Sequence, residues 1–477
     1  MGSRKVTSTV SPDFQGKHVT VAGLGVSGIP AAKVLHARGA LVTVVNDGDD
    51  ARAREQAAEL EALGITVRLG DGATLPEGTE LIVTSPGWKP DSPLFEAARA
   101  AGVEIWGDVE LAWRLRGPEA APWLAITGTN GKTTTTQMLA SILKAAGLRT
   151  AAVGNIGIPV LDAVLGEEQY DVLAVELSSY QLHWAPSLRA HSAAVLNLAP
   201  DHLDWHGSME AYARDKGRVY EGNRVACVYN VADKATEDLV READVEEGCR
   251  AIGFTLGSPG PSQLGVVDGI LVDRAFVENR QKNAQELAEV SDVNPPAPHN
   301  IANALAAAAL ARAFGVPAKA VRDGLRAFTP DAHRIAHVAD VDGVAYVDDS
   351  KATNTHAAEA SLAAYDSIVW IAGGLAKGAS FDELVAKSAK RLRGVVLIGA
   401  DRALIREALT RHAPEVPVVD LDRTDTGAML QAVTEAKRLA QPGDTVLLAP
   451  ACASMDMFTN YNKRGDAFAE AVRELGS

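Results

Sequence analysis

The sequence has few cysteines and no long apolar run. Its three cysteines, Cys227, Cys249 and Cys452, are widely separated, so they match neither a zinc-binding motif nor a disulfide framework, and we expect a reducing compartment. No stretch reaches the roughly 20 apolar residues of a membrane-spanning helix, and the first residues lack the apolar core of a secretory signal. We therefore expect a cytoplasmic protein that does not bind membranes.

Positive charge is also scarce. The chain has 46 Lys and Arg against 61 Asp and Glu, a formal net charge of -15. A chain with this charge repels polyanions, so we expect no binding of nucleic acid or of anionic lipid. An anionic small molecule would have to be held by a local group of positive side chains.

The length and the patterning together indicate three α/β domains. A chain of 477 residues exceeds what one hydrophobic core supports. Short β-branched runs alternate with helical patterns, which is typical of parallel sheets flanked by helices. Polar segments bearing proline or glycine at 115–122 and 327–334 divide the chain. We predict a Rossmann-like domain over 1–117, a central P-loop domain over 118–330 and a second Rossmann-like domain over 331–477, the last opening with a hairpin that turns at Asp342-Gly343.

The most informative stretch is GTNGKTT at 128–134, between an apolar strand pattern and a helical pattern. Backbone N–H groups in such a loop, together with the helix dipole, favour phosphate oxygens. Lys132 would neutralise the β and γ phosphates of ATP, and the Thr133 hydroxyl would ligate Mg²⁺. The predicted ATP-binding loop is Gly128, Thr129, Asn130, Gly131, Lys132, Thr133 and Thr134.

Other motifs are less specific when taken alone. GLGVSG at 23–28 has dinucleotide-fold spacing, with Asp47 where a ribose-binding acid falls, which favours a nucleotide diphosphate site, but its glycines could also serve tight strand–helix packing. Glu176 ends a strand pattern and could ligate metal or simply be solvated. Lys216 would pass for a surface lysine.

Together these residues resemble the Mur ligases, the ATP-dependent amino-acid-adding enzymes of bacterial cell-wall precursor synthesis. GTNGKTT is followed in the expected order by GNIG (154–157), ELSSYQL (176–182), DHLD (201–204), HNIAN (299–303), HR (333–334) and DDSKATN (348–354). Within the family, GLGVSG and APACASMDMF (449–458) are most similar to the D-glutamate-adding member, and the D-N-P-R motif of another member is absent. The resemblance covers nearly the whole chain.

The resemblance implies a reaction. ATP phosphorylates the carboxylate of UDP-N-acetylmuramoyl-L-alanine, D-glutamate attacks the acyl phosphate, and the amide, ADP and phosphate are released. The implied cofactors are ATP and Mg²⁺ at two sites, the implied partners are these small molecules, and we expect a monomer.

The resemblance also implies roles for individual residues. Lys132, His202 and Lys216 are the implied catalytic residues, and Lys216 is expected to be carbamylated. The implied metal ligands are Thr133, Glu176, His202 and Lys216. The adenine nucleotide is further assigned to Asn300, Asn303, Arg334, Asp349 and Lys351. The UDP-substrate is assigned to Gly25, Val26, Ser27, Asp47, Ser85, Pro86, Gly87, Asn155, Ser178 and Gln181, and D-glutamate to Thr353, Lys377, Ser454, Met455 and Tyr461.

Three alternatives stay open at this point. A folylpolyglutamate synthetase would not need the GLGVSG domain, an NAD-dependent dehydrogenase would use Gly23–Gly28 and Asp47, and a P-loop switch protein would lack ligase chemistry. The chain also departs from the family pattern at Gly48 and Asp49, beside the expected uracil, and at Leu375 and Ala376 near Lys377.

Overall fold

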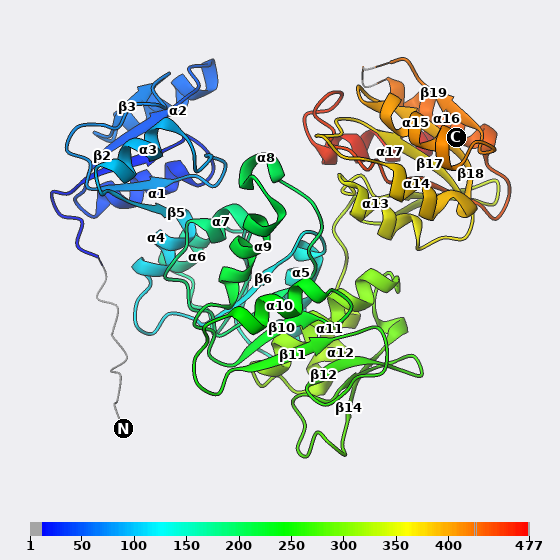
Figure 1. The fold of residues 1–477 in the computed structure, drawn as a ribbon, viewed down its shortest axis with the longest axis horizontal. Coiled ribbons are helices and arrows are strands. Elements are labelled where there is room, and N and C mark those ends of the chain that lie inside the picture. Colours follow the sequence, from blue (N-terminus) through cyan, green and yellow to red (C-terminus); the bar gives the residue numbers. More distant parts are fainter. Residues whose placement is uncertain (1–11, 424, 426, 476–477) are drawn as a thin grey trace. The chain divides into compact units, whose positions relative to one another are not determined.

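A computed structural model describes residues 12–423, 425 and 427–475 (Figure 1). The first eleven residues, part of the segment from which we expect no secretory signal, lie outside this description. The described chain forms three separate sheets. It divides into two compact units, one running to Val293 together with Ile301–Phe328, the other containing Asn294–Asn300 and the residues from Thr329 onward. The predicted α/β class with three sheets is therefore confirmed, whereas boundaries at residues 117 and 330 stay predictions.

The first sheet is five-stranded, parallel and ordered β3-β2-β1-β4-β5. Its strands are β1 (His18–Ala22), β2 (Leu41–Asn46), β3 (Thr66–Leu69), β4 (Leu81–Thr84) and β5 (Glu104–Gly107). The helices between and after them are α1 (Gly28–Ala37), α2 (Ala51–Glu61), α3 (Pro93–Ala100) and α4 (Asp108–Leu115). The strand order reverses between β1 and β4, and in such sheets ligands bind outside the carboxyl ends of the strands at this point.

The second sheet has nine strands in the order β14-β13-β12-β11-β10-β9-β6-β8-β7. They are β6 (Trp123–Thr127), β7 (Ala152–Gly154), β8 (Leu173–Glu176), β9 (Ser192–Val195), β10 (Ala226–Asn230), β11 (Arg250–Phe254), β12 (Gln263–Val267), β13 (Ile270–Asp273) and β14 (Gln285–Glu289). The strands from β7 to β12 run parallel, and β13 is antiparallel to both its neighbours. The carboxyl ends of β9, β6, β8 and β7 therefore share one edge.

Helices cover this sheet on both faces. They are α5 (Lys132–Ala145), α6 (Val160–Leu165), α7 (Ser179–His183), α8 (Leu203–His206), α9 (Met209–Gly217), α10 (Lys234–Glu242), α11 (Pro298–Ala313) and α12 (Ala318–Ala327), with short 3₁₀ turns η1 (Arg218–Tyr220) and η2 (Val290–Asp292). In α11 every side chain from Ala304 to Ala311 is fully buried. A helix that is apolar all round is a core helix, and its alanines allow close approach of its neighbours.

The third sheet is ordered β15-β16-β20-β17-β18-β19. Its strands are β15 (Ala336–Val341), β16 (Val344–Asp348), β17 (Ile368–Gly373), β18 (Leu392–Ile398), β19 (Val418–Asp420) and β20 (Thr445–Leu448). Its helices are α13 (Thr355–Leu362), α14 (Asp382–Ser388), α15 (Arg402–His412), α16 (Ala428–Leu439) and α17 (Tyr461–Leu475), with the 3₁₀ turn η3 (Ala389–Arg391).

Two details of this sheet bear on the sequence reading. β15 pairs antiparallel with β16, and Asp342 and Gly343 have φ values of 53° and 77°, so the predicted hairpin turn is confirmed. Trp370 in β17 is fully buried, and its indole Nε1 donates to Ala449 O at 2.7 Å, which ties the sheet to the loop after β20.

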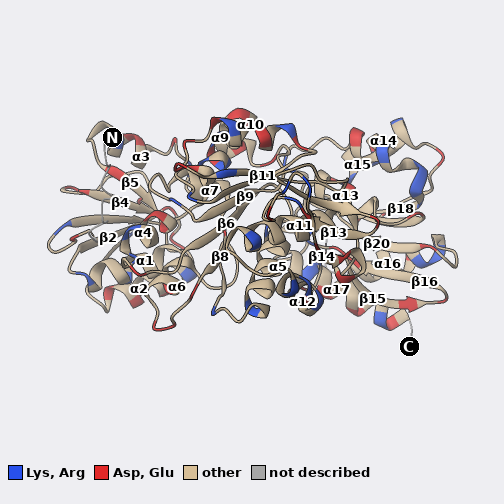
Figure 2. Ribbon diagram, turned by 90° about the horizontal axis from the view of Figure 1, so that it is seen from below, with Lys and Arg blue, Asp and Glu red and all other residues tan. Residues whose placement is uncertain are grey.

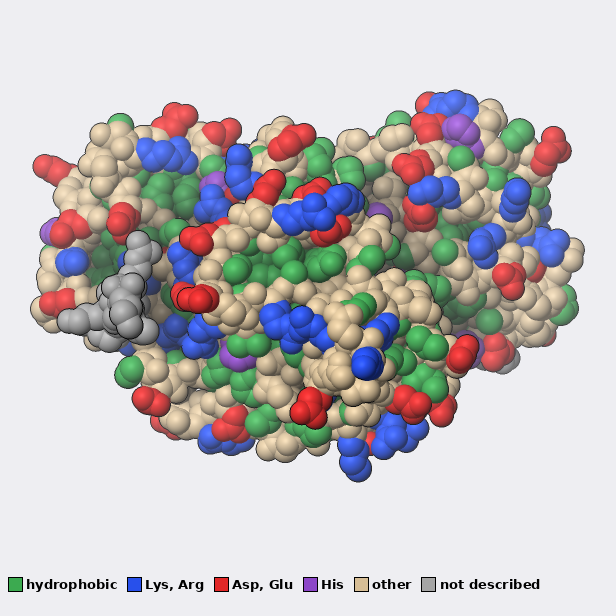
Figure 3. Space-filling model, turned by 60° about the horizontal axis from the view of Figure 1, so that its bottom comes forward, with side chains coloured by type: hydrophobic (Ala, Val, Ile, Leu, Met, Phe, Trp, Pro, Cys, Tyr) green, Lys and Arg blue, Asp and Glu red, His purple; other side chains and the backbone are tan. Residues whose placement is uncertain are grey.

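Acidic and basic residues are both distributed along the ribbon in Figure 2, and on the face shown in Figure 3 charged side chains of both signs are interspersed. On α10, for example, Lys234 pairs with Glu237 and Asp238. Among the described residues, no helix is both long and apolar enough to cross a membrane.

Candidate active site

The predicted ATP-binding loop leaves the carboxyl end of β6 and enters α5, as the motif requires. Gly128 and Gly131 have positive φ values of 150° and 83°, and a Cβ on Gly131 would lie 2.4 Å from Asn303 Oδ1. Glycine is therefore needed at residue 131 for both backbone and space. The Asn130 N–H donates to Asn197 Oδ1 at 2.9 Å, so the segment after β9 helps fix the shape of the loop.

Two lysines converge on this loop. Lys132 Nζ donates to Gly128 O at 3.0 Å and to Thr129 O at 2.9 Å. Lys216, on α9, is 2% exposed, and its Nζ donates to Gly128 O at 2.8 Å. Burial, and secondly the charge of Lys132, lower the pKa of Lys216 well below its ordinary value. Lys216 is thus not a surface lysine, and its surroundings favour the neutral form of the amine.

A buried carboxylate lies on the neighbouring strand. Glu176 ends β8 and is 1% exposed; its Oε1 accepts from Asn155 Nδ2 at 2.9 Å, whereas its buried Oε2 has no hydrogen-bond partner. Leaving a buried carboxylate oxygen without a donor is unfavourable, and a cation would relieve it. Glu176 thus has the character expected of a metal ligand.

The predicted donor set is compatible with Mg²⁺ in chemistry. The described residues contain no cluster of three or more His, Cys, Asp or Glu that could hold a metal. The predicted set does not need one, because only Glu176 and His202 belong to those residue types. His202 has a φ of 55°, its ring centroid lies 4.9 Å from that of Tyr180, and its Nε2 lies 3.5 Å from Asp201 Oδ2.

Sequence reasoning missed the residue beside Lys216. Asp215 Oδ2 contacts His183 Nδ1 at 2.8 Å and His206 Nδ1 at 2.9 Å, and Asp215 Oδ1 lies 3.2 Å from Arg218 Nε. Burial opposes the charge of Asp215, but these hydrogen bonds outweigh it and lower its pKa to about 2. The carboxylate therefore fixes α9, and with it Lys216, to α7 and α8. No spacing in the sequence signals this network.

At the sheet of the N-terminal region, the loops after β1 and β4 meet where the strand order reverses. A Cβ on Gly28 would lie 1.9 Å from Gly23 O, so Gly28 serves tight packing, while Gly25 has open space around its Cα. Val26 is 77% exposed. Ser85 Oγ is buried without a partner, and Ser85, Pro86 and Gly87 follow β4 directly. Asp47, after β2, is exposed.

Asp108 joins these loops to the ELSSYQL segment. Its Oδ2 accepts from Ser27 Oγ at 2.8 Å and from Gln181 Nε2 at 3.5 Å. Gln181 also completes a capping box with Ser178 at the start of α7. Burial raises the pKa of Asp108. Three residues predicted to contact the UDP-substrate are thus brought together around an aspartate that the sequence did not single out.

In the second unit, the predicted ligand residues follow three neighbouring parallel strands. Asp349, Lys351 and Thr353 follow β16, Lys377 follows β17, and the third group follows β20: Ser454, Met455 and Tyr461.

The environments of these residues differ. Asp349 is buried beside the Ser361 hydroxyl, and burial raises its pKa to about 6. Lys351 Nζ lies 3.9 Å from the centroid of the Tyr461 ring. Ser454 is buried, whereas Met455 is 62% exposed. Arg334 is partly buried, and its charge opposes the rise in the pKa of Asp349.

A buried arginine holds two of these loops. Arg464, on α17, is 1% exposed and donates to Ser350 Oγ at 3.0 Å, Ser350 O at 2.8 Å and Cys452 O at 3.1 Å. It was not predicted, because an arginine on a polar helix gives no sign of burial. The two predicted asparagines fall in different units: Asn300 donates to Pro295 O at 3.3 Å in the second, and Asn303 lies against Gly131 in the first.

The fold is a three-sheet α/β protein in which the glycine-rich loop at 128–134 joins β6 to α5. The sequence matches the family descriptions "Mur ligase MurD-like, N-terminal domain" over residues 17–107, "Mur ligase middle domain" over 126–311 and "Mur ligase, glutamate ligase domain" over 333–452. The chain belongs to the Mur ligase family.

Individual relatives agree with this assignment. A UDP-N-acetylmuramoylalanine–D-glutamate ligase from Streptomyces coelicolor is 88% identical over 98% of this chain and 99% of its own length. Its counterpart from Streptomyces avermitilis is 88% identical over 98% of this chain and 100% of its own. In fold, the chain resembles UDP-N-acetylmuramate-alanine ligase from Thermotoga maritima, with a TM-score of 0.56 and 18% identity over 96% of this chain and 99% of that one.

Proposed function

We propose that this chain is an ATP-dependent ligase that joins D-glutamate to UDP-N-acetylmuramoyl-L-alanine in peptidoglycan precursor synthesis. The observation that carries the ATP-dependent step is the glycine-rich loop with Lys132, flanked by the buried Lys216 and the buried Glu176. The substrates are supported by the names of relatives that are 88% identical over nearly the entire chain.

The chemistry explains why these charges gather. A carboxylate oxygen of the UDP-substrate attacks the γ phosphorus of ATP, the bond to the β–γ bridging oxygen breaks, and ADP leaves. The amine of D-glutamate then attacks the acyl carbon, loses a proton, and phosphate departs. In the first step two anions approach each other, so the site must neutralise charge and align the reacting groups. We assign that role to Lys132 and the N–H groups of the loop.

We assign Mg²⁺ to Thr133, Glu176, His202 and carbamylated Lys216, in two sites that share this region. When bound, Mg²⁺ would offset the phosphate charge of ATP. The buried, unpartnered Glu176 Oε2 suits such a mixed donor set.

Carbamylation of Lys216, which the resemblance implies, is supported by its surroundings. Carbon dioxide forms a bond to a neutral amine nitrogen, which then loses a proton, so a cation becomes an anion. For an ordinary lysine of pKa about 10.4, only on the order of one amine in a thousand is neutral at neutral pH. Burial and Lys132 lower the pKa of Lys216 and so remove that obstacle.

The remaining contacts are those that the resemblance to the Mur ligases implies. We place the UDP part of the substrate at the loops after β1 and β4 and the muramoyl-alanine along Asn155, Ser178 and Gln181. We place the adenine nucleotide also near Asn300, Asn303, Arg334, Asp349 and Lys351. D-Glutamate is assigned to the loops after β17 and β20 and to Thr353. A reaction that consumes ATP and a UDP-linked precursor belongs in the cytoplasm, where the free cysteines also persist.

The test is phosphate release from ATP with UDP-N-acetylmuramoyl-L-alanine and, separately, D-glutamate, L-alanine, L-lysine or diaminopimelate. We expect release only with D-glutamate. Dependence on another amino acid would overturn the substrate assignment, and indifference to ATP would overturn the ligase assignment. Binding of the UDP-substrate by the full chain separates this proposal from a folylpolyglutamate synthetase.

A further inference from the structure

A pocket of about 690 Å³ lies apart from the ATP-binding loop, at the other edge of the nine-stranded sheet. Arg250, in this pocket, is the first residue of β11, which runs parallel to β10, β9 and β6. The ATP-binding loop follows the last residue of β6. The amino ends of parallel strands lie opposite their carboxyl ends, so the pocket and the loop occupy opposite edges.

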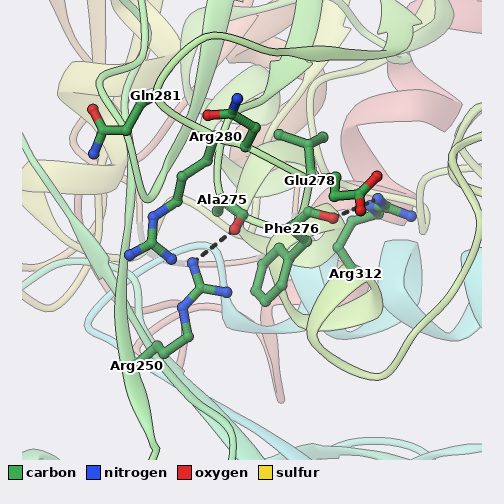
Figure 4. Close-up of a pocket in the computed structure, with 9 residues that line it drawn as sticks. Arg250, Ala275, Phe276, Glu278, Arg280, Gln281 and Arg312 are labelled. Carbon is green, nitrogen blue, oxygen red and sulfur yellow. Dashed lines mark hydrogen bonds between the residues drawn. The ribbon is translucent and has the colours of Figure 1, made fainter.

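Two arginines face this pocket without a carboxylate partner. Arg250 Nη2 donates to Ala275 O at 2.7 Å, and its guanidinium carbon lies 5.2 Å from the centroid of the Phe276 ring. Among the described residues, the Arg280 guanidinium has neither a hydrogen-bond nor an ion-pair partner. Figure 4 shows the two guanidinium groups pointing toward one another. Burial, and then the charge of Arg280, lower the pKa of Arg250, while the charge of Asp273 acts against them.

The third arginine of the pocket, Arg312, is different, because each of its three guanidinium nitrogens donates a hydrogen bond. Arg312 Nε donates to Asp273 Oδ2 at 2.9 Å, Nη1 to Val316 O at 2.7 Å and Nη2 to Phe276 O at 3.3 Å. It supports the loop that carries Phe276 and Arg280, and its charge is balanced by Asp273. Glu278 is the one carboxylate among the lining residues, and it is exposed. Arg250 and Arg280 therefore carry the uncompensated charge.

We propose that this pocket binds a phosphate-bearing small molecule between Arg250 and Arg280. A guanidinium offers a planar pair of N–H donors that matches phosphate oxygens. Two such cations match the two charges of a phosphate group, whereas a monocarboxylate would leave one cation unbalanced. The Phe276 ring supplies an apolar wall to the pocket. The pocket is distinct from the catalytic loop and is independent of the ligase assignment.

The test is equilibrium binding of labelled inorganic phosphate to the full chain, with a non-hydrolysable ATP analogue and Mg²⁺ saturating the catalytic loop. We expect one additional phosphate per chain. Arg280→Ala should weaken that binding about tenfold or more, the range for one lost charge-assisted hydrogen bond. The phosphate affinity of Arg280→Lys should lie between those of the parent chain and of Arg280→Ala, because lysine keeps the charge but lacks the planar pair of N–H donors. Lys282→Ala, in the same exposed loop but not lining the pocket, is the matched control.

Arg280 is preferred to Arg250 for this test because its side chain supports no other described residue, so its replacement should not unfold the chain. Binding that is absent, or unchanged in Arg280→Ala, would overturn the proposal. Acetate tests whether a carboxylate binds instead. If acetate displaces labelled phosphate as well as unlabelled phosphate does, the assignment to phosphate is wrong.

Discussion

At the scale of single residues, the carbonyl of Gly128 accepts hydrogen bonds from both Lys132 and Lys216. Two ammonium groups on one oxygen repel each other, so the arrangement favours a neutral form for one of them. Lys216 is the more buried of the two, and its pKa is lowered. The neutral amine needed for modification is therefore favoured at Lys216, beside the lysine that we assign to phosphate.

Lys132→Ala should lower the ligase rate by at least about 10²–10³-fold, because it removes a fixed donor from the developing phosphate charge. The measurement is kcat from phosphate release at saturating substrates. Lys144→Ala, an exposed position on the same helix, should leave the rate unchanged. A loss of less than tenfold for Lys132→Ala would contradict the assigned role.

Lys216→Ala should abolish most activity, and added acetate or formate should restore part of it, because a small carboxylate would replace the lost carbamate. The rate with and without the added acid is the measurement. Lys234→Ala, an exposed lysine on α10, should neither lose activity nor respond to acid. Full activity of Lys216→Ala before any addition would rule out carbamylation as a requirement.

At the scale of elements, α9 is held by a charge and not only by apolar packing. In the unfolded chain the carboxyl of Asp215 titrates near pH 4, and in the fold its pKa falls to about 2. A lowered pKa contributes stability that is fully present above about pH 4 and is lost as the pH falls toward about 2.

Asp215→Asn should therefore lower the free energy of unfolding at pH 7 by about 2 kcal/mol and flatten its decline between about pH 4 and pH 2. Urea unfolding across this range measures both effects. Asp238→Asn, at an exposed position on α10, should change neither. If the unfolding free energy of Asp215→Asn declines between about pH 4 and pH 2 as steeply as that of the parent chain, Asp215 does not cause the decline.

α17 is likewise joined to two loops through one side chain. Arg464→Ala would leave the carbonyls of Ser350 and Cys452 without this donor in a buried place, and we expect a loss of about 3 kcal/mol in unfolding free energy. The KM for D-glutamate should rise as well, since both loops carry its assigned residues. Lys463→Ala, exposed and adjacent, is the control; equal effects at the two positions would refute the role of Arg464.

The sequence predicted those elements whose signal is local. The strand–loop–helix at 123–145 and the hairpin at Asp342-Gly343 follow from glycine spacing and apolar runs, and both are present. β14, with the sequence QELAE, and the three-residue β7 were not predicted, because neither has an apolar run long enough to indicate a strand. GLGVSG left two readings open, and the contact at Gly28 shows that packing accounts for that glycine.

The candidate site was predictable only in outline. Alternating strands and helices place the ligand loops at the carboxyl edges of their sheets, so positions such as Glu176 and Lys377 could be anticipated. Asp108, Asp215 and Arg464 could not. Their roles depend on burial and on partners such as Gln181, His183 and Ser350, which lie 73, 32 and 114 positions away in the chain.

At the scale of the whole molecule, the two compact units have separate hydrophobic cores. Chains of this kind need not unfold in one step. We expect two transitions in scanning calorimetry, with Arg464→Ala lowering the temperature of one and Asp215→Asn that of the other. Coincident shifts of a single transition would show that the units unfold together.

Of the seven tryptophans, Trp370 alone belongs to the second unit. With the other six changed to phenylalanine, tryptophan fluorescence would report on the second unit alone. The Trp370 indole donates a hydrogen bond to Ala449 O, at the start of the loop that joins β20 to α17. Its emission wavelength should therefore change when that loop moves or binds a ligand, without any attached dye.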